Sequence, residues 1–83
     1  MTEDSIVDIL KKIRPEFEFL GVDDFFARGM LDSFDLTALI AALEEKYSVV
    51  IDAGDILPNN FQSVEAITKL LVKYGATSPV DHV

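Results

Sequence analysis

Hydrophobic residues recur with the period of an α-helix in three stretches of the chain, which predicts main helices over residues 3–14, 34–47 and 64–74. The apolar faces of these helices are Ile6, Ile9, Leu10 and Ile13, then Leu36, Leu39, Ile40, Leu43 and Tyr47, then Val64, Ile67, Leu70, Leu71 and Tyr74. Pro15 should end the first helix, because the residue before a proline is disfavoured in helical conformation. Gly75 should end the last one.

The long connection between the first two helices is too apolar to lie free in water. Its large apolar residues are Phe17, Phe19, Leu20, Phe25, Phe26, Met30 and Leu31. Connections of this length are usually either functional or packed down. We therefore expect the segment to lie over the helices, with bends at Gly21 and Gly29 and a helical turn at residues 23–27.

The connection after the second long helix contains a β-prone run, residues 48–52, with no partner strand in the chain. We expect it to be extended, with Val49 and Ile51 in the core, and to be followed by a short helix over residues 55–57 that ends at Pro58. The pattern as a whole predicts an all-α fold of three major helices and one short helix. It also predicts one domain over residues 1–75, with residues 76–83 as a flexible tail.

Composition and charge exclude several classes of function. The 83 residues are 49% hydrophobic, enough for one small core, and the net charge of −8 opposes binding to nucleic acids and anionic membranes. No run approaches the ~18 apolar residues of a membrane span. The first residues, MTEDSIVD, are too acidic for a signal peptide, so we expect a cytoplasmic location.

The sequence offers no set of side chains suited to catalysis or metal binding. It has no Cys, and its single His, His82, lies two residues from the end. Neighbouring acids such as Glu44 and Glu45 point about 100° apart on a helix, so they do not share a site. We expect no enzyme and no metal site.

Ser33 stands apart because it opens the strongest predicted helix, where two roles are open to it. As an N-cap, its hydroxyl would accept a hydrogen bond from a backbone N–H of the first turn. A helix N-terminus also favours a phosphate, so a phosphodiester on this hydroxyl would be tolerated.

The residues around Ser33 resemble those of a known family. The run Gly29-Met30-Leu31-Asp32-Ser33-Phe34-Asp35 is similar to the Asp-Ser-Leu motif of acyl carrier proteins, the phosphopantetheine-attachment domain. The resemblance continues through LTALIAALEEKYSVVI and into NFQSVEAI, so that it covers about residues 5 to 74. It implies an acyl-carrier-type four-helix bundle.

The resemblance also implies a function. A phosphopantetheinyl transferase would attach 4'-phosphopantetheine from coenzyme A to Ser33, and the thiol of that group would carry an acyl or aminoacyl group as a thioester. The other partners would be an acyl- or aminoacyl-activating ligase and a downstream acyltransferase or synthase of a biosynthetic pathway. The partner-binding residues would be Asp32, Phe34, Asp35, Ala41, Glu44 and Glu45. We expect a monomer, because each apolar face has a partner within the bundle.

Three positions depart from carriers of fatty-acid synthesis. Ala38 stands where those proteins typically have Glu, Ala41 where they have a large apolar residue, and Lys46 where they often have an acid. The Gly-x-Leu-Asp-Ser form instead resembles stand-alone carriers such as D-alanyl and peptidyl carriers, which adenylating ligases load. Phe34 replaces the usual Leu or Met, and its ring either anchors a partner or folds against the first loop.

A hypothesis of a different class remains open beside the carrier. The chain could be a non-covalent, acidic interaction module in which Ser33 is an N-cap and nothing more.

Overall fold

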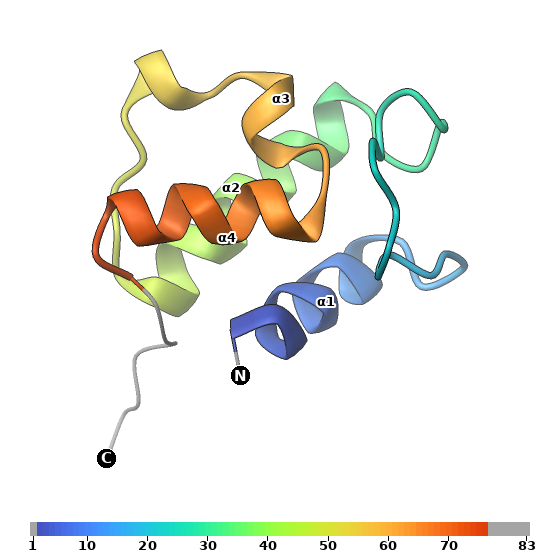
Figure 1. The fold of residues 1–83 in the computed structure, drawn as a ribbon, viewed down its shortest axis with the longest axis horizontal. Helices are drawn as coiled ribbons and strands as arrows, with labels where there is room; N and C mark the ends of the chain where they lie inside the picture. The colour runs from blue at the N-terminus through green and yellow to red at the C-terminus, as the bar shows by residue number, and fades with distance from the viewer. Residues whose placement is uncertain (1, 77–83) are drawn as a thin grey trace.

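The computed structural model describes residues 2–76, and side chains from residue 4 onward. Within that range the chain is all-helical and contains no strand. The elements are α1 (Thr2–Ile13), α2 (Ser33–Tyr47), the 3₁₀ turn η1 (Ala53–Asp55), α3 (Pro58–Phe61) and α4 (Val64–Lys73) (Figure 1). The predicted all-α class is confirmed, and each long helix begins and ends within one residue of its predicted bounds.

One hydrophobic core joins the helices. α1 packs against both α2 and α4, and α3 packs against α4. Figure 1 shows α1 on one side of the molecule and α3 on the other, with α2 and α4 between them. The side chains with less than 2% exposure are Phe19, Phe25, Phe61, Ile6, Leu10, Leu39, Leu43, Ile67 and Leu71. The core therefore draws on every long helix and on the first connection, as the apolar pattern predicted.

The connection from α1 to α2 is packed into the core. Phe19 and Phe25 are buried and meet edge to face, with ring centroids 5.2 Å apart. The Phe25 backbone N–H donates to the Gln62 carbonyl at 2.7 Å, which ties this segment to the start of α4. Leu20 is the exception, with 62% of its surface exposed.

The predicted helical turn in this connection is present. The Asp24 carboxylate accepts hydrogen bonds from the N–H groups of Phe26 and Ala27, both at 3.0 Å, and the Arg28 N–H donates to the Asp24 carbonyl. Gly29 then reverses the chain with a φ of 72°, a value that favours glycine.

The prediction of a short helix over residues 55–57 was wrong. The structure instead has the 3₁₀ turn at Ala53–Asp55, and a separate helix, α3, starts at Pro58. A proline is well suited to the first position of a helix, because its fixed φ is already helical and the N–H that it lacks has no partner there. Pro58 therefore begins a helix where we expected it to end one.

Polar contacts join the extended connection after α2, through Asp52 and Asp55, to the end of α4. Lys73 Nζ lies 2.8 Å from Asp55 Oδ1, and the Tyr74 hydroxyl donates to Asp55 Oδ2 at 2.6 Å. The Asp52 N–H donates to the same tyrosine oxygen at 2.9 Å. Ile51 is buried, as predicted, so this segment is held by both apolar and polar contacts.

The end of α4 differs slightly from the sequence prediction. Gly75 has a φ of 72°, and the Ala76 N–H donates to the Leu71 carbonyl at 2.8 Å, which closes the helix. Ala76 is 8% exposed, so it belongs to this ending and not to a tail. Residues 77–83, which include His82, lie outside the described residues.

Candidate functional site

The first turn of α2 is capped by Asp32, so the prediction that Ser33 is the N-cap was wrong. The Asp32 carboxylate accepts a hydrogen bond from the Asp35 N–H at 2.9 Å, and the Asp35 carboxylate accepts one from the Asp32 N–H at 3.2 Å. This reciprocal pair is a capping box. A carboxylate can cap as well as a hydroxyl, and the sequence places one at each of the two positions that the box needs.

Ser33 is the first residue of α2, and it is exposed. Its carbonyl accepts a hydrogen bond from the Thr37 hydroxyl at 3.2 Å. Its own hydroxyl makes no hydrogen bond to any of the described residues, so no base within residues 4–76 is placed to take its proton. The hydroxyl is therefore better suited to receive a group from another enzyme than to attack a substrate by itself.

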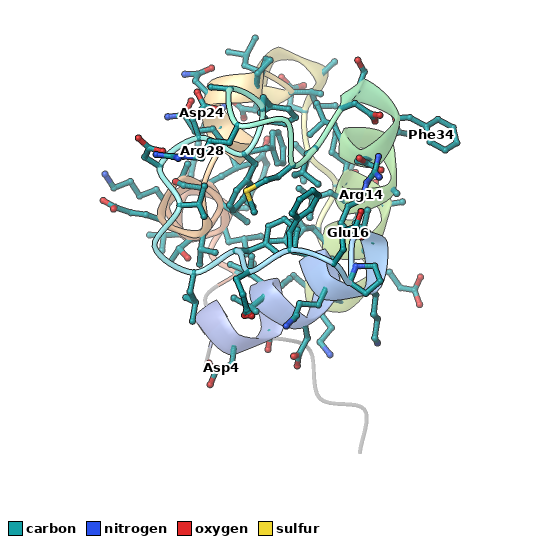
Figure 2. All side chains as sticks on the ribbon, turned by 90° about the vertical axis from the view of Figure 1, so that its right-hand side faces the viewer. Asp4, Arg14, Glu16, Asp24, Arg28 and Phe34 are labelled. Carbon is teal, nitrogen blue, oxygen red and sulfur yellow. The ribbon has the colours of Figure 1, made fainter. Side chains whose placement is uncertain are left out.

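Asp35 is buried, with 7% of its surface exposed, and it pairs with Arg14 at the end of α1. Arg14 Nε donates to Asp35 Oδ2 at 2.8 Å. Its two other nitrogens lie 3.5 Å from Asp32 Oδ2 and 3.6 Å from Glu16 Oε2. One guanidinium therefore contacts three carboxylates near the start of α2. Figure 2 shows Arg14 and Glu16 beside this part of the molecule.

These contacts keep the residue before Ser33 charged. The hydrogen bond from the Asp35 backbone, with a smaller contribution from the Arg14 charge, lowers the pKa of Asp32. The hydrogen bond to Asp35 and the charge of that carboxylate raise the pKa of Arg14. The site at neutral pH is thus a neutral hydroxyl next to an ionised cap.

Sequence reasoning missed Arg14. It lies 21 residues before Asp35, directly after the end of α1, and a single arginine before a proline gives no signal of its partner. The burial of Asp35 was missed for the same reason, because its carboxylate turns inward only where the end of α1 meets the start of α2.

Of the residues predicted to meet partners, three are exposed on one face of α2. Phe34 is 84% exposed, and Figure 2 shows its ring standing clear of the ribbon, so it does not fold against the first loop. Ala41 and Glu45 follow it at helical spacing, and both are exposed. These three residues and Ser33 thus share the outer side of α2.

Two of the predicted partner-binding acids are engaged within the protein. Asp35 is buried against Arg14, and Glu44 Oε2 accepts a hydrogen bond from the Ile51 N–H at 2.9 Å. Asp32 remains exposed, although its carboxylate caps the helix. We therefore leave Asp35 and Glu44 out of the partner surface that is proposed below.

The site fits a group that is attached through a phosphodiester. Such a group needs an exposed hydroxyl on a fixed backbone, and Ser33 provides one at the start of a helix of 15 residues. The Arg14 guanidinium contacts the residue on the N-terminal side of Ser33. None of the helices in the described range is long and apolar enough to cross a membrane.

Comparison with known proteins gives one match. The model of the family described as phosphopantetheine attachment site matches residues 5–71. No curated protein and no solved structure matches the chain. Domains of this family carry covalently attached 4'-phosphopantetheine and are generally not catalytic themselves. Since the match spans most of the sequence and includes the start of α2, the chain belongs to the phosphopantetheine-attachment family of carrier domains.

Proposed function

We propose that this protein is an acyl carrier protein, which holds an acyl or aminoacyl group on 4'-phosphopantetheine at Ser33 and shuttles it between partner enzymes. One observation supports the choice of residue above all. Ser33 opens α2 with an exposed hydroxyl, and Asp32 has taken over the capping role that would otherwise explain a serine there.

The chain itself contributes position and access to this function. The bound group supplies the thiol that carries the cargo as a thioester. The capping box fixes the backbone on both sides of Ser33, and the exposed position leaves space for a transferase and later for the partners. We propose no catalytic residue in this chain, and we expect it to act in the cytoplasm with the enzymes that load and unload it.

The structure weakens the alternative, a non-covalent acidic module. That hypothesis needed Ser33 to be the N-cap, and Asp32 fills this position. The residues that this module would use for docking, Phe34 and Glu45, are both exposed, so the identity of the cap is the observation that separates the two functions.

The carrier could serve a specialised pathway, and the exposed side of α2 favours this. Between Phe34 and Ala41, the exposed residues on that side are an aromatic ring, Thr37 and Ala38. Glu45, one turn after Ala41, is the first exposed acid there. A surface with so little charge suits a dedicated partner that recognises shape and apolar area. An aminoacyl or D-alanyl carrier loaded by its own adenylating ligase is therefore the second candidate. The intact mass of the protein isolated from its own cells would identify the cargo.

Modification in vitro tests the proposal. Incubation with coenzyme A and a phosphopantetheinyl transferase of broad specificity should add one phosphopantetheine group to the intact mass. Ser33→Ala should gain nothing, whereas Ser63→Ala, which removes the other serine at the start of a helix, should be modified like the wild type. A wild-type chain that stays unmodified with several competent transferases would contradict the proposal, as would modification of Ser33→Ala.

A further inference from the structure

We propose that Arg14 is a positioning residue for the attachment reaction: through Asp35 it holds the start of α2, and its charge offsets the carboxylates around Ser33. This inference rests on the proposed function. It concerns a residue outside the attachment motif, directly after the end of α1.

The Arg14 backbone is itself well fixed. Its N–H donates to the Leu10 carbonyl at 2.9 Å, in continuation of α1, and its carbonyl accepts from the Phe17 N–H at 3.3 Å. Pro15 follows directly and restricts the backbone further. The guanidinium is therefore held by a rigid part of the chain.

From this base, Arg14 fixes the residues on both sides of Ser33. Asp35 Oδ2 accepts hydrogen bonds from Arg14 Nε at 2.8 Å and from the Asp32 N–H at 3.2 Å. Asp35 is the single charged residue that is buried within the part of the chain whose side chains are described. A buried carboxylate that loses its partner is costly, so removal of Arg14 would disturb the capping box itself.

Charge gives Arg14 a second role at the same place. Asp32, Asp35 and Glu16 all lie within 3.6 Å of its guanidinium nitrogens. Coenzyme A is anionic, and its phosphates must approach the Ser33 hydroxyl during transfer. The Ser33 oxygen forms a bond to the phosphorus that bears the pantetheine group, its proton passes to a base of the transferase, and the pyrophosphate bond breaks to release adenosine 3',5'-bisphosphate. Without Arg14 they would meet three carboxylates with no cation among them, and electrostatic repulsion would slow the approach.

The test is the steady-state rate at which a transferase modifies the full chain, measured well below the Tm of each variant. We expect Arg14→Gln to lower kcat/KM by about tenfold at low salt, because small displacements of a reacting group have large effects on rate. Arg14→Lys should have a higher kcat/KM than Arg14→Gln because of a lower KM, since lysine keeps the positive charge but cannot make the Nε contact. Added salt should narrow the difference between the variants, because it screens the charge component.

Arg28→Gln is the matched control. Arg28 Nε lies 2.9 Å from Asp23 Oδ1, almost the same distance as in the Arg14–Asp35 pair, but both side chains are exposed, and their ion pair with each other lies outside α2. This variant should stay within about twofold of the wild type, since exposed ion pairs contribute little. An equal loss in Arg28→Gln would overturn the inference, because it would show a general effect of charge.

The remaining outcomes are also distinct. If Arg14→Gln does not fold, kcat/KM of two other variants tests the inference. One is Arg14→Lys, and the other is the double variant Arg14→Gln/Asp35→Asn, which removes the buried Asp35 charge together with its partner. A folded variant without the Arg14 guanidinium that is modified at the wild-type rate would overturn the inference and leave the proposed function intact. A wild-type chain that no transferase modifies would overturn the proposed function instead.

Discussion

Asp32 and Ser33 are neighbours in the chain, but they have separate tasks at the start of α2. The carboxylate of Asp32 satisfies the backbone of the first turn, and this leaves the Ser33 hydroxyl without a structural role in the helix. Ser63 at the start of α4 is different, because its hydroxyl accepts a hydrogen bond from the Ala66 N–H at 3.0 Å. The two serines therefore form a natural comparison.

We predict that Ser33→Ala changes the free energy of unfolding by less than about 0.5 kcal/mol, as is usual for an exposed residue that makes no special contact. Ser63→Ala should lower it by about 1 kcal/mol, since it removes an N-cap. Urea denaturation of the unmodified proteins, followed by circular dichroism, measures both values. A larger loss in Ser33→Ala than in Ser63→Ala would mean that Ser33 does help to hold the helix.

At the scale of elements, the connection between α1 and α2 behaves as part of the core. Phe25 is fully buried, its N–H bonds to Gln62, and its carbonyl accepts from the N–H groups of Met30 and Leu31 at 2.8 and 3.3 Å. Nine residues further on, Phe34 leaves 84% of its surface in solvent. Phenylalanine is thus part of the core before Ser33 and exposed to solvent directly after it.

We predict that Phe25→Ala lowers the free energy of unfolding by about 3–5 kcal/mol, because it removes a large side chain and leaves a cavity. Phe34→Ala should change it by less than about 0.5 kcal/mol. Chemical denaturation of both variants gives the comparison. Similar losses in the two proteins would show that the first connection is not packed as described, or that Phe34 is not free.

For the whole molecule, the net charge of −8 matters less than where its carboxylates find partners. Among the residues that the structure describes, three carboxylates have a pKa below the ordinary value. The main causes are hydrogen bonds: from Arg28 to Asp23, from the Asp35 backbone to Asp32, and from Lys73 to Asp55. The last of these also joins the segment after α2 to α4.

We also predict that the protein is a monomer. A sedimentation coefficient that does not change with concentration would support this prediction.

The pH dependence of stability follows from these shifts. Each folded-state pKa lies below the unfolded value of about 3.9, so its contribution is present above that pH and is lost as the pH falls through the folded-state value. We predict that Tm decreases below about pH 4, and that the decrease is smaller in Asp55→Asn. Calorimetric scans at low ionic strength measure the effect. A Tm that is flat or rising over this range would contradict it.

The sequence determined the helices and much of the core. Helical periodicity depends on local spacing, so it located the three long helices. The apolar content of the first connection predicted that it packs on the helices, and Phe19 and Phe25 are buried there. Pro58 shows where local signals fail, because a proline is compatible with both the end and the start of a helix. The prediction of Ser33 as the attachment residue came from a motif, and it stays a proposal.

The tertiary structure decided which polar groups are free. Asp35 and Glu44 look like solvated acids in the sequence, yet one pairs with Arg14 and the other binds the backbone of Ile51. A side chain's partners depend on which segments meet in space, and 21 residues separate Arg14 from Asp35. The sequence motif therefore led to the proposal of Ser33 as the attachment residue, whereas the packing of α1 against α2 decided which side chains surround the start of α2.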